Sequence, residues 1–152
     1  MTNTNKGYLG NKNLPGRGST YAYTPEQINE LAKCAADIDY FAEKYFTIVH
    51  VDHGKIKIPL YEYQHNLLAH IQKHRFCAIL QARQSGKTTT NTIFILWYIL
   101  FHKDKAVAIL ANKASTSRSI LGRIKLAFEL LPNWMKPTVE EWNKGSVTFD
   151  TE

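Results

Sequence analysis

The stretch that decides the fold is residues 76–88, Phe-Cys-Ala-Ile-Leu-Gln-Ala-Arg-Gln-Ser-Gly-Lys-Thr. Its first five residues, Phe76–Leu80, are a continuous apolar run, which is typical of a strand buried on both faces of a sheet. A loop containing Gly86 follows, and the pattern then predicts a long helix over residues 87–102. A Gly-Lys-Thr tripeptide between a buried strand and a helix is the setting that a phosphate-binding loop requires.

In such a loop, Gly86 lets the backbone approach phosphates closely, and the start of the helix favours an anion. Lys87 would neutralise the β- and γ-phosphates, and Thr88 would supply a hydroxyl group to Mg²⁺. The predicted nucleotide-binding set is completed by neighbouring loop and helix residues, namely Gln84, Ser85 and Thr89. The first glycine of the usual G-x-x-x-x-G-K-[ST] pattern is replaced here by Gln81.

Three further residues are candidates for the same site. Arg83 is either an arginine finger that stabilises charge on the transferring phosphoryl group or a loop residue in solvent. Tyr63 can stack on adenine, and Gln64 can pair with its Hoogsteen edge. Alternatively, Gln64 is a surface residue on an amphipathic helix, predicted over residues 60–72 with Tyr63 facing inward.

The remaining elements extend this arrangement. A second buried strand is expected over residues 105–111 and a second long helix over 115–131. Strand, helix, strand, helix predicts an α/β fold with a parallel sheet, occupying residues 59–152. A further strand begins at Gly145.

The N-terminal part divides into two segments. Residues 1–23 are rich in glycine and predict a flexible arm, or else a segment that becomes ordered on a partner. Residues 24–58 predict a helical and hairpin extension. A capping box opens its first helix, a second short helix covers residues 39–46, and a hairpin turns at Asp52-His53-Gly54.

Composition limits the class of protein. The 152 residues carry a net charge of +6 with a pI of about 9.3, which suits contact with nucleic acid or phosphate. Cys34 and Cys77 lie in apolar stretches and are expected to be buried free thiols in a reducing compartment. The chain opens without a signal peptide, and its longest apolar run, Ile93–Phe101, is too short to span a bilayer. We therefore expect a soluble intracellular protein.

Two histidine pairs are candidate metal ligands, His50 with His53 and His70 with His74. Too few acidic or thiol ligands accompany them, so we expect ordinary surface histidines.

Several stretches together resemble one family. They are the loop Arg83–Thr88, the aromatic segment Tyr61–Gln64, the apolar run 105–112, residues 129–132 with 141–146, and residues 9–15 with 39–45. The chain is similar to the N-terminal ATPase region of the large terminase subunit of tailed bacteriophages, the motor that packages DNA into proheads. The deviant Walker A loop of that family has the form Arg-Gln-x-Gly-Lys-Thr, without a first glycine.

The resemblance implies a P-loop NTPase (RecA-like) sheet that binds ATP and Mg²⁺ through Lys87 and Thr88. Arg83 would be the sensor or finger, and Gln64 would read adenine. The implied partners are double-stranded viral DNA, the portal protein and the small terminase subunit, in an oligomeric ring. The implied location is the host bacterial cytoplasm and transiently the prohead portal. In related helicases the segment after the second strand contacts a nucleic-acid backbone. The corresponding basic residues here are either such contacts or a solvated helix face, namely Lys113, Arg118, Arg123 and Lys125.

The family's Walker B strand, four apolar residues followed by Asp-Glu, has no match in this sequence, and Asp150-Thr-Glu152 does not fit it. From this we expect a fragment or split gene product that binds ATP, with the nuclease domain absent. The alternatives are a helicase-like DNA translocase and a non-catalytic docking module that contacts the small terminase subunit or portal through residues 1–46. A nucleoside kinase is a weaker alternative.

Overall fold

The structure is a computed structural model, which describes residues 6–50, 52, 54–57 and 59–150. Its helices are α1 (Pro25–Ala36), α2 (Ile38–Tyr45), α3 (Glu62–Lys73), α4 (Lys87–Phe101), α5 (Ala114–Leu130) and the short 3₁₀ turn η1 (Asn133–Met135). Its strands are β1 (Gly7–Tyr8), β2 (Asn11–Pro15), β3 (Ile48–His50), β4 (Gly54–Ile56), β5 (Thr138–Trp142) and β6 (Val147–Asp150). The described strands form three antiparallel hairpins, so the fold combines α-helices with small antiparallel sheets.

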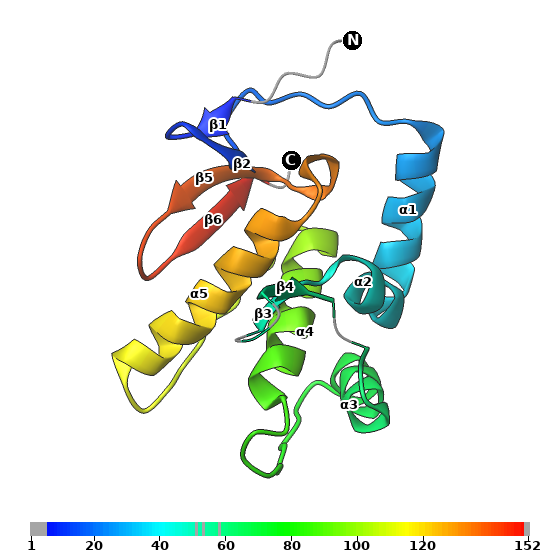
Figure 1. Ribbon diagram of the computed structural model, residues 1–152, viewed down its shortest axis with the longest axis vertical. Coiled ribbons are helices and arrows are strands. Elements are labelled where there is room, and N and C mark those ends of the chain that lie inside the picture. The colour runs from blue at the N-terminus through cyan, green and yellow to red at the C-terminus, as the bar shows by residue number, and fades with distance from the viewer. Residues whose placement is uncertain (1–5, 51, 53, 58, 151–152) are drawn as a thin grey trace.

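Helix α4 is the centre of the molecule (Figure 1), with α5 packed on one side and α2 and α3 on another. Its residues from Ile93 onward are apolar nearly all round the helix, and a helix of that kind must be buried. Ile93 and Leu96 are fully buried and join Phe41 of α2 and Phe128 of α5 in one core. The core therefore holds the helix whose first residues form the candidate site.

The predicted capping box of the first helix is confirmed. The Thr24 hydroxyl accepts from the Gln27 backbone N–H at 3.3 Å, and the Gln27 side chain accepts from the Thr24 backbone N–H at 3.0 Å. The predicted second helix is also confirmed as α2, where Asp37 caps the first turn. These ends are local in sequence, because a cap needs only the residues within one turn.

A hydrogen-bonded cluster around one carboxylate, that of Glu30, joins α1 to α2. Glu30 accepts from the hydroxyl groups of Tyr40 at 2.9 Å and Tyr45 at 2.7 Å, and from Lys44 Nζ at 2.7 Å. The hydrogen bonds from Lys44 and Tyr45 lower the pKa of Glu30 to about 2. The carboxylate therefore stays charged down to strongly acidic pH.

Part of the segment expected to be a flexible arm forms a hairpin instead. Strands β1 and β2 pair antiparallel, and Leu14 in β2 is only 2% exposed. The carbonyl oxygen of Asn13 accepts from Lys136 Nζ at 2.8 Å. Composition alone favours an irregular arm, but these long-range contacts with β5 and η1 hold the hairpin in place.

The predicted hairpin of the extension is confirmed by the antiparallel pair β3 and β4, in which Ile48 lies opposite Ile56. Residues 51, 53 and 58 of that prediction lie outside the described residues.

The predicted parallel sheet is not formed by the described residues. Segments 76–80 and 105–111 carry no strand pairing, and the side chains of Phe76, Leu80 and Leu110 are 84%, 101% and 89% exposed. A buried strand needs hydrogen-bonding neighbours on its edges and packed side chains on its faces. The described part of the chain supplies no such neighbour to either segment.

The strand predicted from Gly145 is present as β6, but it pairs antiparallel with β5 rather than joining a parallel sheet. Phe149 of β6 packs on Phe128 with their ring centroids 4.6 Å apart. None of the helices in the described part of the chain is long and apolar enough to cross a membrane.

Candidate phosphate-binding site

The loop before α4 has the backbone form of an anion site. Gly86 has φ 76° and Gln84 has φ 61°, so two residues immediately before the helix have the left-handed backbone conformation. Gly86 caps α4 without a side-chain hydrogen bond, and the first turn of α4 contains no acidic residue. The first backbone N–H groups of a helix lack partners inside it and attract a negative charge. Loop and helix together can therefore accept a phosphate group.

Lys87 places its ammonium group on the same loop. Its Nζ donates to the carbonyl oxygens of Gln81 at 2.7 Å and Ala82 at 3.1 Å. The Ser85 hydroxyl donates to the Ala82 carbonyl oxygen at 2.9 Å, which ties the middle of the loop to its start. A bound phosphate would compete with these carbonyl groups for the Lys87 ammonium.

Helix α3 contacts the loop and helix α4 through the two residues predicted to bind adenine. The Tyr63 hydroxyl donates to the Ser85 carbonyl oxygen at 2.8 Å. Gln64 is 3% exposed, and its Nε2 donates to the Thr90 hydroxyl at 3.1 Å. Sequence reasoning missed Thr90, and the only available signal was its place one turn after Gly86 in a run of three threonines.

Tyr63 was expected to face inward on α3, and this was wrong, because its side chain is 43% exposed. Its ring stacks on that of Tyr61 at a centroid distance of 5.6 Å and an interplanar angle of 10°. The pair is an exposed aromatic surface beside the loop, of the kind on which a base can stack.

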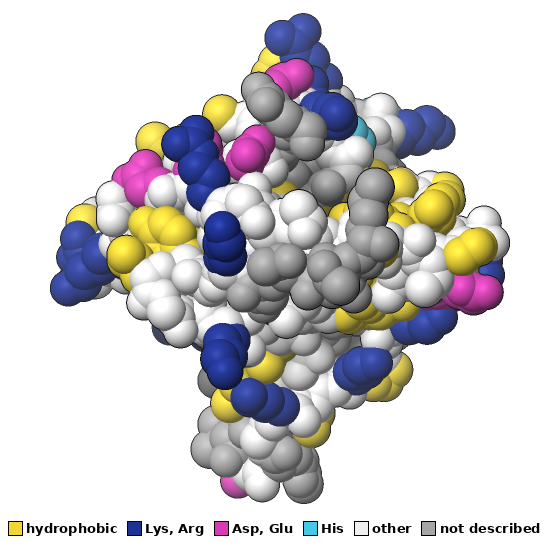
Figure 2. All heavy atoms as spheres, turned by 90° about the horizontal axis from the view of Figure 1, so that it is seen from above, with side chains coloured by type: hydrophobic (Ala, Val, Ile, Leu, Met, Phe, Trp, Pro, Cys, Tyr) yellow, Lys and Arg dark blue, Asp and Glu magenta, His cyan; other side chains and the backbone are white. Residues whose placement is uncertain are grey.

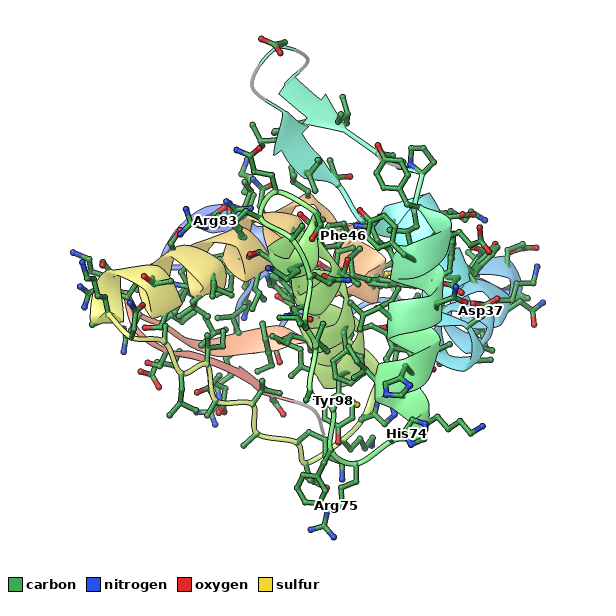
Figure 3. The ribbon with its side chains drawn as sticks, turned by 90° about the horizontal axis from the view of Figure 1, so that it is seen from below. Asp37, Phe46, His74, Arg75, Arg83 and Tyr98 are labelled. Atoms are coloured by element: carbon green, nitrogen blue, oxygen red, sulfur yellow. The ribbon has the colours of Figure 1, made fainter. Side chains whose placement is uncertain are left out.

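The other predicted site residues lie on the same loop and helix. Arg83 is exposed on the loop that leads into α4 (Figure 3) and forms no ion pair within the described residues. Thr88 and Thr89 are half-buried in the first turn of α4. Thr88 is suitably placed in sequence to offer a hydroxyl group to a phosphate-bound cation. The described residues contain no group of three His, Cys, Asp or Glu side chains that could hold a metal by themselves.

The basic residues of α5 do not share one surface. Arg118 and Lys125 line a cavity of about 810 Å³, whereas Arg123 lines a separate one of about 300 Å³ beside Thr89. Lys125 donates to the Asn143 carbonyl oxygen and lies 4.7 Å from the ring centroid of Trp142. Figure 2 likewise shows Lys and Arg side chains spread over the face it presents rather than gathered in one patch.

The cysteines and the candidate histidine pairs are not part of this loop. Cys34 is buried, and burial raises the pKa of its thiol to about 11, whereas Cys77 is only half-buried. His70 and His74 are exposed, with ring centroids 4.3 Å apart. The side chain of His50 and all of His53 lie outside the described residues.

Residues 78–152 match the family described as "Terminase large subunit, T4likevirus-type, N-terminal". The matched segment contains the phosphate-binding loop, α4, α5 and the β5–β6 hairpin, and α3 lies outside it.

Proposed function

We propose that this chain is the ATP-binding part of a viral DNA-packaging motor, since residues 78–152 match the family of N-terminal regions of large terminase subunits. The observation that carries the proposal is the loop before α4. It combines a left-handed glycine, a helix start without a side-chain cap, and a lysine whose ammonium group lies against the loop. These are the features that hold the β- and γ-phosphates of a nucleotide.

Each residue has a role in this proposal. Lys87 neutralises the phosphates, and Thr88 offers its hydroxyl group to Mg²⁺. Arg83, exposed and without an ion pair among the described residues, is available to stabilise charge on the transferring phosphoryl group. The Tyr61–Tyr63 pair offers a stacking surface for the base.

Hydrolysis requires one more group. A carboxylate must orient the attacking water, and the sequence contains no run of four apolar residues followed by Asp-Glu that would supply it. The proposal therefore assigns nucleotide binding to this loop and leaves the catalytic carboxylate to another part of the motor. Translocation of double-stranded DNA and contacts with the portal protein and small terminase subunit, in an oligomeric ring, belong to the same proposal.

We also propose that segments 76–80 and 105–111 are strands of a P-loop sheet. Segments 76–80 and 105–111 flank α4 in sequence in the strand–helix–strand order of a P-loop sheet. The exposed side chains of Phe76, Leu80 and Leu110 would be covered by additional strands pairing with these segments. A sheet completed in this way places the phosphate-binding loop at the carboxyl end of a strand, where ligands bind in open α/β sheets.

The test is titration with a fluorescent ATP analogue in the presence of Mg²⁺. We expect the wild type to bind and Lys87→Ala to bind at least about tenfold more weakly, because a charge-assisted contact with phosphate is lost. Lys103→Ala is the matched control, since Lys103 is an exposed lysine just beyond the opposite end of α4. Equal affinity of the wild type and Lys87→Ala would refute the phosphate-binding role.

A further inference from the structure

The amide group of Gln64 is committed to contacts inside the protein. Its Oε1 accepts from the Tyr61 backbone N–H at 3.0 Å, which completes the first turn of α3. Its Nε2 donates to the Thr90 hydroxyl at 3.1 Å in α4. Only 3% of the residue is exposed, so a base could reach the amide only if the contact between α3 and α4 opened.

The contact continues from Thr90 into the phosphate-binding loop. Thr90 is 1% exposed, and its hydroxyl donates to the Gly86 carbonyl oxygen at 3.3 Å. Gly86 is the residue whose left-handed backbone starts α4. Gln64, Thr90 and Gly86 therefore form one hydrogen-bonded path from α3 to the turn that would hold phosphate.

Gln64 also packs directly against that turn. A Cβ atom added to Gly86 would lie 2.6 Å from Gln64 Nε2, closer than real Cβ contacts. Glycine is therefore favoured at position 86 by its φ of 76°, and any other residue would also have to displace the Gln64 amide from its hydrogen bonds. On the other side of the loop, the Tyr63 hydroxyl holds the Ser85 carbonyl group at 2.8 Å.

We propose that Gln64 is a positioning residue that holds the phosphate-binding loop in its left-handed form through Thr90 and Gly86. This inference rests on the proposed nucleotide-binding function. It differs from a role in reading adenine in one measurable way. A positioning residue affects every ligand that has a triphosphate, whereas a base-reading residue affects only ligands that have the right base.

The experiment compares three ligands on the full chain: ATP, GTP and inorganic tripolyphosphate, which has no base. Gln64→Met keeps the side-chain volume and removes both hydrogen bonds. We expect it to weaken all three ligands alike, by about three- to tenfold, the effect of one or two lost hydrogen bonds. Gln72→Met is the matched control, because Gln72 is an exposed glutamine of the same helix whose amide donates to the Leu68 carbonyl oxygen within that helix.

A second variant removes the other end of the contact. Thr90→Val keeps the side-chain shape and lacks the hydroxyl group, so we expect the same parallel loss. The double variant Gln64→Met/Thr90→Val should be no weaker than the weaker single variant, because both changes break one path. Thr90→Val also keeps the test decisive if Gln64→Met does not fold, and thermal unfolding shows which variants are folded.

The outcomes separate this inference from the proposed function. If wild type binds tripolyphosphate and Gln64→Met binds it equally well but loses its preference for ATP over GTP, Gln64 reads the base and the positioning role is overturned. Additive losses in the double variant would also overturn it. If the wild type binds neither ATP nor tripolyphosphate, the proposed function itself fails.

Discussion

Lys136 is a buried lysine that joins three parts of the chain. It is 4% exposed, and its Nζ donates to the carbonyl oxygens of Asn13 and Glu129, each at 2.8 Å, and to Asn133 Oδ1 at 3.1 Å. The substitution Lys136→Met keeps the aliphatic stem and removes all three hydrogen bonds. It leaves the oxygen atoms of the N-terminal hairpin, α5 and η1 that form these partly buried hydrogen bonds without this donor.

The size of the effect follows from these contacts. An acceptor that loses its hydrogen bond costs about 1–3 kcal/mol, and three acceptors lose this donor. Removal of the buried charge relieves its desolvation cost and offsets part of that loss. We therefore expect Lys136→Met to lower the free energy of unfolding by about 2–4 kcal/mol near neutral pH. For a chain of this length this corresponds to a fall in Tm of roughly 5–15 °C.

The pH dependence gives a second readout of the same residue. Burial lowers the pKa of Lys136 from 10.5 to about 8. Between these values the unfolded chain keeps a proton that the native protein has released, so the free energy of unfolding rises with pH. Each pH unit of this interval is equivalent to about 1.4 kcal/mol. The stability difference between the wild type and Lys136→Met should therefore widen by about 3 kcal/mol across the interval.

The assay is urea unfolding followed by tryptophan fluorescence at several pH values from about 7 to 10.5. Lys144→Met is the control, because Lys144 is exposed in the turn between β5 and β6. Equal unfolding midpoints for the wild type and Lys136→Met near neutral pH would refute the hydrogen-bond reasoning. A stability difference that stays constant above about pH 8 would refute the lowered pKa.

Three further predictions concern single sites. The lowered pKa of Glu30, about 2 against 4.5, means that its contribution to stability is present above about pH 4.5 and is lost as the pH falls toward 2. Glu30→Gln should therefore flatten the acid side of the stability curve in urea unfolding, and an unchanged slope would contradict this. At about pH 8 a thiol reagent should modify Cys77 quickly and buried Cys34 only on unfolding, so two fast thiols would contradict the burial of Cys34. Gly86→Ala should lower the free energy of unfolding by at least about 1–2 kcal/mol, because alanine is strained in the left-handed backbone of this position. Adding Gln64→Ala should recover only the part of this loss that comes from the clash with the Gln64 side chain, as thermal unfolding can measure. Full recovery in the double variant would show that the backbone is not strained.

Much of the local structure could be predicted from the sequence. The capping box at Thr24, the helix starting at Lys87 and the hairpin of β3 and β4 all depend on residues close together in the chain. The terminase resemblance was based on the loop Arg83–Thr88 and several further stretches, and the family match over residues 78–152 confirms it for the loop and the stretches that follow.

Predictions that depended on distant neighbours were less successful. Apolar content predicted buried strands at 76–80 and 105–111, but no described segment pairs with either of them. Glycine content favoured a flexible arm where the β1–β2 hairpin forms, because the stabilising donor, Lys136, is 123 residues away from Asn13. Composition reflects only the intrinsic preference of a segment. The structure of these segments depends instead on which distant residues pair with them or pack against them.

The sequence by itself determined that a glycine-lysine-threonine loop starts a helix, and from this it predicted a place for phosphate. Only the tertiary structure decided what Gln64 touches. Gln64 and Thr90 are 26 residues apart, and their contact exists because α3 and α4 bury their apolar faces against one another. That packing excludes water from the Gln64 amide, so the amide must find its partners inside the protein. They are the Tyr61 backbone N–H at the start of α3 and the Thr90 hydroxyl of α4, which in turn donates to the Gly86 carbonyl oxygen of the loop.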